Sequence, residues 1–294
     1  MITAAQITGP LCAHGEGPVW DAAEGVIRWV DMVAGIVHRL DPAAVDGAGT
    51  GAAGLIRTGA GTDETRVGDW VAALRPRIGG GWVVATRDGF LLTDEALHPE
   101  REIRAFEDDV LRMNEGGCTA DGAFLCGTAG PAGTGFLYRL DPSGEASVLS
   151  GGITVSNGIA ADPLGDGMLY VDTATRRIDR LRIDGGALVE RAPFADLSGQ
   201  EGLPDGIATD IEGGVWVAMW GGGAVIRFDA AGRPDDRIEL PTPQVTACAF
   251  GGAQRDELYI TTSQQGLATP DARAGALFRA HPGIRGAVEP SFGG

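Results

Sequence analysis

The sequence predicts an all-β protein, a six-bladed β-propeller. Short apolar runs alternate with turn residues along the chain, and glycine accounts for 48 of its 294 residues, which is typical of many tight turns. Polar residues at Asn114, Asn157 and Asp205 begin similar stretches and are spaced by 43 and 48 residues. A period in the forties with several strands per unit is the pattern of a propeller.

The predicted units cover the chain as one domain, residues 1–294, with blades that begin near residues 16, 71, 114, 157, 205 and 246. The fifth unit shows the pattern most clearly. A Pro-Asp-Gly turn containing Asp205 precedes a short apolar strand, an Asp-x-x-Gly turn at Asp210 and a second apolar strand, as in a β-meander. A β-solenoid could share this period, but polar residues at one phase of every unit favour convergence on an axis.

The sequence also predicts the structure of several shorter segments. A recurring motif should form the third strand of a blade and the turn after it. It occurs as His38-Arg39-Leu40-Asp41-Pro42, Tyr138-Arg139-Leu140-Asp141-Pro142 and Arg227-Phe228-Asp229. Residues 53–57 could form a fourth strand, whereas residues 94–106 should be loop or one short turn. We expect residues 2–8 to close the ring by completing the blade that ends at Phe278.

The net charge limits the classes of molecule that this protein is expected to bind. There are 23 basic and 40 acidic residues, a net charge of −17. Nucleic acid would be repelled, because phosphate binding needs a basic surface, and a polyanionic substrate would be disfavoured. A divalent cation would be attracted, although acidity that serves only solubility is an equally simple explanation.

The cysteines and the N-terminal region predict a reduced, cytoplasmic protein. No pair of the four cysteines has Cys-x-x-Cys spacing, so a zinc knuckle or thioredoxin motif is not indicated, and we expect buried free thiols. The N-terminus lacks a basic and apolar leader pattern. No run approaches the roughly 20 apolar residues that span a membrane, so no membrane partner is expected.

The residues that begin the units form a predicted ring of polar groups. The first strand of each propeller blade lines the central channel, so Glu16, Asn114, Asn157, Asp205 and Thr246 should converge on one mouth. Strand alternation places Arg112 on the same side as Asn114. These oxygen donors suit Ca²⁺, Mg²⁺ or Mn²⁺. Each Asn or Asp alone could simply cap a glycine turn, but five residues in register favour the ring and a metal site at the mouth.

These stretches resemble the blade starts of the senescence marker protein/gluconolactonase/luciferin-regenerating enzyme (regucalcin-like) family. The resemblance covers essentially the whole chain and is carried by Gly15-Glu16-Gly17-Pro18-Val19-Trp20, Arg112-Met113-Asn114-Glu115-Gly116, Ser156-Asn157-Gly158, Pro204-Asp205-Gly206 and Cys248-Ala249-Phe250-Gly251-Gly252. It implies a six-bladed propeller with one divalent metal ion, Ca²⁺ in the first place, with Zn²⁺, Mg²⁺, Mn²⁺ or Fe²⁺ as alternatives.

The same resemblance implies roles for individual residues. Glu16, Asn157 and Asp205 would be the metal ligands, Arg112 and Asn114 would hold the substrate, and Asp205 would also be the catalytic residue that handles the proton. The chain departs from the family at Glu115, where an aspartate is frequent. It also has no acid after Gly127-Thr128, where animal members carry a substrate-binding glutamate, and this leaves the sugar open.

The expected reaction is metal-dependent hydrolysis of a sugar lactone, an aldono-1,4- or 1,5-lactone, to the aldonic acid. A metal with open positions supplies carbonyl polarisation and charge stabilisation, and Asp205 would move a proton. No Gly-x-Ser-x-Gly motif indicates a serine hydrolase. Alternatives are a non-catalytic calcium-binding or regulatory propeller and a paraoxonase-like arylesterase. Two further residues could reach the mouth: Trp220, as an apolar wall under a sugar ring, and His14.

Overall fold

The computed structural model describes residues 2–47 and 62–294, and it is an all-β structure. Apart from α1 (Pro42–Gly47) and the 3-10 turn η1 (Thr173–Thr175), the regular elements of these residues are strands. The possible strand at residues 53–57 lies outside the described residues.

Four of the sheets consist of four sequential antiparallel strands each. They are β2 (Gly15–Asp21), β3 (Val26–Asp31), β4 (Ile36–Leu40) and β5 (Thr62–Arg66); β6 (Ala73–Pro76), β7 (Trp82–Ala85), β8 (Gly89–Thr93) and β9 (Pro99–Arg104); β10 (Arg112–Cys118), β11 (Phe124–Ala129), β12 (Gly135–Leu140) and β13 (Ala146–Ile153); and β14 (Ser156–Ala161), β15 (Met168–Asp172), β16 (Arg177–Asp184) and β17 (Ala187–Asp196).

The fifth sheet has eight strands because the N-terminal strand joins two meanders. One meander contains β18 (Leu203–Thr209), β19 (Val215–Trp220), β20 (Ala224–Phe228) and β21 (Pro234–Glu239); the other contains β22 (Val245–Gly251), β23 (Glu257–Thr262) and β24 (Phe278–Ala280). Between them, β1 (Ile2–Gln6) runs parallel to β21 and antiparallel to β24. The prediction that the N-terminal segment completes the sheet ending at Phe278 is therefore confirmed.

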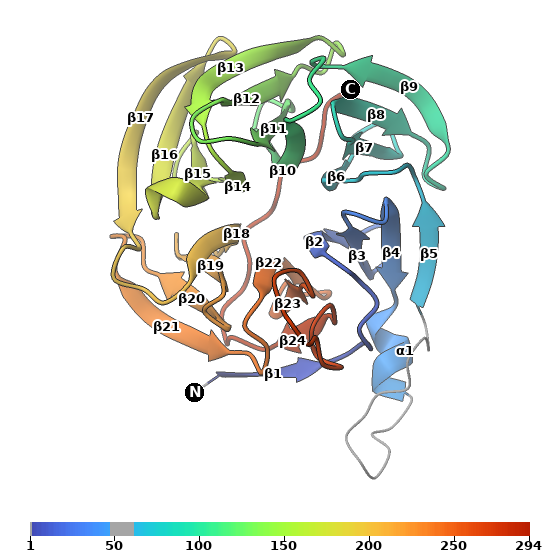
Figure 1. The fold of residues 1–294 in the computed structure, drawn as a ribbon, viewed down its shortest axis with the longest axis vertical. Helices are drawn as coiled ribbons and strands as arrows, with labels where there is room; N and C mark the ends of the chain where they lie inside the picture. The colour runs from blue at the N-terminus through green and yellow to red at the C-terminus, as the bar shows by residue number, and fades with distance from the viewer. Residues whose placement is uncertain (1, 48–61) are drawn as a thin grey trace.

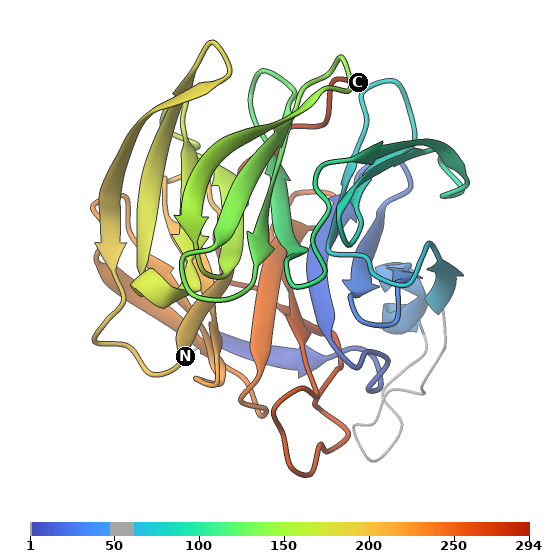
Figure 2. The same ribbon diagram turned by 45° about the horizontal axis from the view of Figure 1, so that its top comes forward.

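The sheets stand around a central axis, with the first strand of each meander innermost (Figures 1 and 2). Consecutive inner strands contact one another, and the last contacts the first: β2, β6, β10, β14, β18 and β22. This arrangement is consistent with the predicted propeller.

Small residues permit the close approach of the inner strands. A Cβ atom on Gly117 would collide with the backbone oxygen of Ile159 on the next inner strand, and one on Gly206 would collide with Ala247. Larger residues here would push the strands apart. The glycines that follow the polar residues therefore bring neighbouring polar residues close together.

A second recurring contact anchors the far ends of three inner strands. Asp210, which follows β18 and is fully buried, accepts hydrogen bonds from Arg227 on β20 and from the indole nitrogen of Trp216. Arg180 and Arg139 make equivalent ion pairs with Asp162 and Asp121. Each arginine lies on the third strand of its sheet, so the pair ties that strand to the turn after the inner strand.

Two sequence expectations about individual strands have different outcomes. The recurring motif is confirmed as the third strand of a sheet, since β4, β12 and β20 are each third in their meander. The expectation of loop over residues 94–106 is wrong, because β9 pairs with β8 as a fourth strand. The sequence of β9, Pro-Glu-Arg-Glu-Ile-Arg, is almost entirely exposed, so it lacks the apolar alternation by which strands are recognised.

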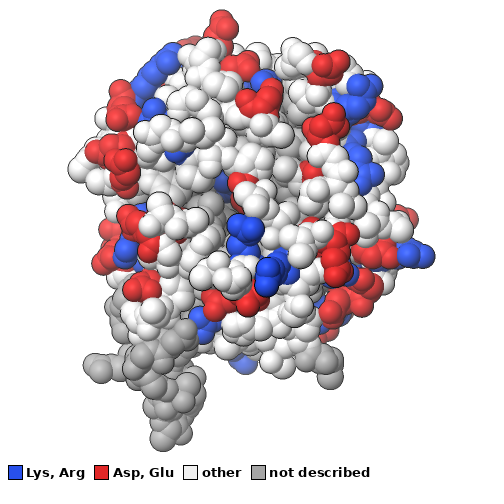
Figure 3. All heavy atoms as spheres, turned by 180° about the vertical axis from the view of Figure 1, so that it is seen from behind, with Lys and Arg blue, Asp and Glu red and all other residues white. Residues whose placement is uncertain are grey.

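The C-terminal segment crosses the end of the ring at which the inner strands finish. Gly286 pairs with Asp210, Phe292 pairs with Arg77, and the amide of Gly293 donates to the oxygen of Gly122. The face opposite to that of Figure 1 carries acidic and basic side chains interspersed rather than one broad basic surface (Figure 3).

We predict that Ala5→Pro lowers the free energy of unfolding by more than about 1 kcal/mol, because the proline removes a backbone donor from a strand that is paired on both sides. Ala5→Ser is the matched control, since the side chain is exposed and the donor is kept. Chemical unfolding measures both; equal stability of the two variants would contradict closure by β1.

Candidate metal and substrate site

The candidate residues lie where the inner strands depart from regular pairing. The register shifts between Met113 and Glu115, between Ser156 and Ile159, and between Pro204 and Ile207. Asn114, Asn157 and Asp205 therefore sit inside the irregular segments. Bulges of this kind redirect a side chain away from the alternation of the strand. Here they lie near the starts of β10, β14 and β18.

Asn114 and Asn157 are linked directly by their side chains. The amide nitrogen of Asn114 donates to the side-chain oxygen of Asn157 at 3.0 Å and to the backbone oxygen of Ser156 at 2.7 Å. The amide nitrogen of Asn157 donates to the hydroxyl of Thr173 at 2.8 Å, and this hydroxyl donates to the backbone oxygen of Pro204 at 2.8 Å. The network fixes the orientation of both amides across three neighbouring inner strands.

Arg112 joins the same network from the start of β10. Its guanidinium donates to the side-chain oxygen of Asn114 and lies 4.6 Å from the centre of the Trp70 ring. Burial lowers the pKa of Arg112, the charge of Glu16 raises it, and the charge of Arg87 lowers it. The structure thus brings the two predicted substrate-binding residues together and places Arg112 within the electrostatic reach of Glu16.

Glu16 and Asp205 are buried carboxyl groups that interact with each other. Only 3% of Glu16 and 5% of Asp205 are exposed. Burial raises the pKa of Glu16 well above its ordinary value, and the nearby charge of Asp205 raises it further. Burial also raises the pKa of Asp205, followed by the charge of Glu115. One carboxyl oxygen of Asp205, Oδ1, has no hydrogen-bond partner among the described residues.

Glu115 is a third buried acid, and its charge raises the pKa of Asp205 and of Glu16. Its Oε1 lies 3.9 Å from Arg75, whose Nε lies 3.6 Å from Glu289 of the C-terminal segment. Burial raises the pKa of Glu115 to about 7, while Arg75 opposes the rise. The glutamate side chain at this position therefore lies near a cation.

Thr246 differs from the other polar residues of the ring. Its hydroxyl donates to the backbone oxygen of Gly15 at 2.6 Å and shares a hydrogen bond with Thr261 at 2.8 Å. Both capacities of the hydroxyl are used within the protein. Thr246 therefore ties β22 to β2 and β23.

Sequence reasoning missed several residues beside His14 and Trp220. The ring of His14 lies edge-on to Trp220 at 5.7 Å, and its Nδ1 is 2.8 Å from the hydroxyl of Ser263. Burial and the charge of Arg112 lower the pKa of His14 to about 4. Trp220 pairs with Gln244, whose buried Oε1 lacks a partner among the described residues. Gln244 precedes Thr246 by two residues, as Arg112 precedes Asn114, so this spacing could have indicated it. Ser263 has no such relation to the residues of the polar ring.

The described part of the chain contains no cluster of three or more His, Cys, Asp and Glu residues able to hold a metal ion. The predicted ligand set does not need one, because it combines two carboxyl groups with an amide. All four cysteines are buried and free, as expected. No helix in the described ranges is long and apolar enough to cross a membrane.

Comparison with known proteins shows what this chain is similar to. A pentonolactonase of Haloferax volcanii, XacC, is 33% identical over 295 residues, covering 95% of this chain and 94% of that protein. A 6-deoxy-6-sulfogluconolactonase of Pseudomonas putida is 32% identical over 293 residues, covering 95% of each. The solved structure of regucalcin from Agrobacterium tumefaciens, described as a calcium-binding protein, superposes with a TM-score of 0.82, 27% identity and 99% coverage of both chains.

The relatives carry the names of lactonases that act on sugar lactones, which supports an enzyme and a hydrolase. The model of one family, the SMP-30/gluconolactonase/LRE-like region, matches residues 14–264, and this range contains every predicted site residue. The chain therefore belongs to the SMP-30/gluconolactonase/LRE-like family.

Proposed function

We propose that this protein hydrolyses a sugar lactone, an aldono-1,4- or 1,5-lactone, to the aldonic acid with the help of one divalent metal ion. The observation that carries the proposal is the pair of buried carboxyl groups of Glu16 and Asp205 beside the amide of Asn157. The names of the two lactonase relatives support the substrate class.

The number of blades in the fold is part of the same proposal. The eight-stranded sheet divides into two four-stranded blades if β1 is counted with β22, β23 and β24. With the four other sheets, this gives one six-bladed propeller over residues 1–294. The metal would lie at the mouth where the inner strands begin.

The donors present fit a hard divalent cation. Two adjacent buried carboxyl groups repel each other when ionised, and an unpartnered oxygen on Asp205 leaves a position for a cation. The side-chain nitrogen of Asn157 is held by Thr173, and its oxygen, which accepts from Asn114, is the atom that could bind a cation. Oxygen donors favour Ca²⁺, with Mg²⁺, Mn²⁺, Zn²⁺ or Fe²⁺ as alternatives. The regucalcin neighbour, described as calcium-binding, supports Ca²⁺.

The chemistry then divides among the residues. A bound divalent ion supplies polarisation of the lactone carbonyl and stabilises negative charge. Asp205 accepts a proton from the attacking water and returns it to the leaving alkoxide. Arg112 and Asn114 donate hydrogen bonds to the sugar hydroxyls and to the carboxylate of the product. Their mutual hydrogen bond and the stacking of Arg112 on Trp70 hold the donors in place.

A second candidate function is calcium binding without catalysis, which is favoured by the calcium-binding description of the structural neighbour. Both functions use the same acids and amide. They differ in whether a lactone is turned over.

A panel of neutral sugar lactones should separate the two functions. We expect acid release from gluconolactone, xylonolactone, arabinonolactone or galactonolactone that stops in EDTA and returns on addition of Ca²⁺ or another divalent ion. A pH-indicator assay measures this, with spontaneous hydrolysis subtracted. Metal binding without turnover of any of the four would favour the calcium-binding function.

Asp205→Asn should lower kcat by roughly 10²–10⁴-fold, the range for loss of a general base, and should weaken metal binding. Asp184→Asn is the matched control, since Asp184 is an exposed aspartate at the end of β16. Rates at saturating metal separate the two effects. Near-native turnover by Asp205→Asn would refute the assignment of the proton transfer.

The metal-free protein should lose stability as pH rises. A carboxyl group with a raised folded pKa binds protons more tightly in the folded state, so its stabilisation is present below the ordinary pKa and lost as pH rises through the folded value. The pKa of Glu115 rises from 4.5 to about 7, and the pKa values of Glu16 and Asp205 rise as well. We therefore expect a melting temperature in EDTA that is several degrees lower at pH 8 than at pH 5.

Added Ca²⁺ should remove most of this loss at pH 8, because it binds only the ionised carboxylates of the folded protein. Asp205→Asn should melt higher than the wild type in EDTA at pH 8. A melting temperature that is independent of pH in EDTA would contradict the crowding of acids at this site.

A further inference from the structure

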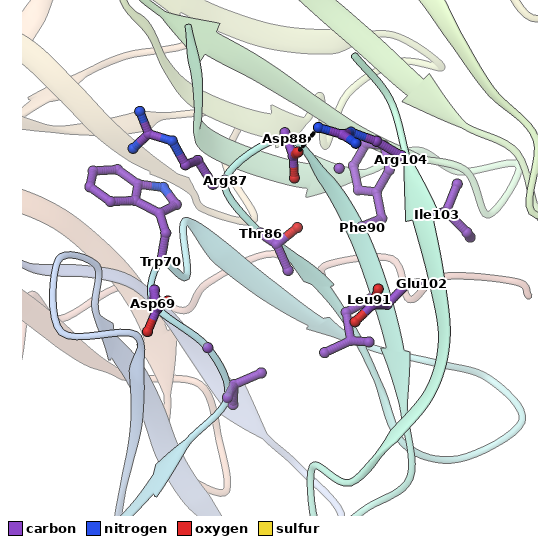
Figure 4. Close-up of a pocket in the computed structure, with 13 residues that line it drawn as sticks. Asp69, Trp70, Thr86, Arg87, Asp88, Phe90, Leu91, Glu102, Ile103 and Arg104 are labelled. Atoms are coloured by element: carbon purple, nitrogen blue, oxygen red, sulfur yellow. Dashed lines mark ion pairs between the residues drawn. The ribbon is translucent and has the colours of Figure 1, made fainter. Parts of the chain in front are cut away.

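A cavity of about 530 Å³ lies beside the candidate site (Figure 4). The segment before β6, the start of β8 and the end of β9 line it, through residues 67–70, 86–91 and 102–104. Trp70 connects the cavity with the site. Its indole nitrogen donates to the backbone oxygen of Met113 at 3.1 Å, and the guanidinium of Arg112 lies over its ring. The ring is therefore held in place at the boundary between the two.

Arg87 also lines this cavity, and in the view of Figure 4 its guanidinium is drawn on the same side of the cavity as the indole of Trp70. The side chain is exposed. Its only hydrogen bond among the described residues goes to the backbone oxygen of Asp109 at 3.2 Å. The positive charge of Arg87 is close enough to lower the pKa of Arg112. The guanidinium groups of Arg87 and Arg112 therefore both contribute positive charge to the space around Trp70.

Neither of these arginines forms an ion pair within the described residues, although acids outnumber bases by 40 to 23. Arg112 contacts only Asn114 and the sulfur of Met32 through hydrogen bonds. Arg104, on the wall of the same cavity, shows the usual situation in this protein, since it pairs with Asp88 and Glu107, each at 3.2 Å. The charge of Glu16 acts on Arg112 from the side of the site and that of Arg87 from the side of the cavity. The two cations repel each other, and an anion between them would relieve that repulsion.

The two arginines lie at different depths. Arg112 is partly buried and hydrogen-bonded to Asn114, next to the metal-binding acids, whereas Arg87 is exposed. Trp70 contacts Arg112 and lines the same cavity as Arg87, so a ligand that extends from Arg112 along this ring enters the space lined by Arg87. The overall charge of −17 does not oppose this contact, because exposed charges beyond about 8–10 Å are largely screened at physiological salt.

We propose that Arg87, together with Arg112 and the ring of Trp70, binds an anionic substituent at the end of the sugar lactone remote from its carbonyl. The proposal rests on the proposed function and names its substrate class. The shared chemistry is a group of anionic oxygens, as in a carboxylate, a sulfonate or a phosphate. A guanidinium group binds such oxygens through charge-assisted, often bidentate hydrogen bonds.

The first test compares kcat/KM for galactono-1,4-lactone, which is neutral, with galactaro-1,4-lactone, which carries a terminal carboxylate, and with 6-phosphogluconolactone. The wild type should prefer at least one anionic lactone by about tenfold or more. Arg87→Gln should lower this ratio by about tenfold, the usual effect of losing one charge-assisted hydrogen bond. Arg104→Gln is the matched control and should leave the ratio unchanged.

Two results would overturn the proposal. One is a wild type that turns over neutral lactones at least as efficiently as both anionic ones. The other is an equal effect of Arg87→Gln and Arg104→Gln on the ratio. Added salt should weaken the preference for the anionic lactone in the wild type more than in Arg87→Gln, so equal salt dependence would also oppose a contact at Arg87.

The second test measures binding rather than turnover, by calorimetry with galactarate and galactonate in the presence of Ca²⁺. Galactarate, with its additional terminal carboxylate, should bind the wild type more tightly, and Arg87→Gln should remove most of that difference. An Arg87-dependent preference for galactarate without turnover of any lactone would support the anion subsite and refute hydrolysis. Metal-dependent hydrolysis with equal binding of the two anions would refute the subsite alone.

Discussion

The close burial of the Glu16 and Asp205 carboxyl groups is the constraint on which the rest of this structure depends. Burial raises the pKa of both carboxyl groups, and the charge of Asp205 raises the pKa of Glu16 further, so a bound cation would favour their ionised forms. The protein nevertheless holds them together through the glycines of the inner strands, the irregular register around Asp205 and the contact between the first inner strand and the last. Each of these features is easier to understand as support for a charged centre than as a contribution to stability.

Polar and charged residues surround these two carboxyl groups on two sides. On one side, Asn114 and Asn157 present fixed amides, and Arg112 brings a cation near Glu16. On the other side, Glu115, Arg75 and Glu289 form an alternating series of charges that leads to the C-terminal segment. The segment that crosses the far end of the ring is thus in electrostatic contact with the interior beneath the site.

The sequence could predict the residues that repeat at one phase, since the spacing from Asn114 to Asn157 and Asp205 reflects successive inner strands. It could not predict Ser263 or Arg87, because they lie outside the residues that begin the units. It could have indicated Gln244, which precedes Thr246 by the two residues that also separate Arg112 from Asn114. It also could not separate Thr246 from the other polar residues, because its partners Gly15 and Thr261 are distant in sequence. The exposed strand β9 has no apolar face to reveal it. The metal ligation and catalytic roles of Glu16, Asn157 and Asp205 stay predictions.

The position of β1 has a consequence for how the chain is made. Its partners β21 and β24 lie more than 230 residues later in the sequence, so the N-terminal strand leaves the ribosome long before either partner exists. At about 5–20 residues per second, it waits some tens of seconds with both edges unpaired. Such distant pairing is a late and slow step. Until it forms, the newly made protein is an open arc with exposed strand edges, the form most prone to pair with another chain.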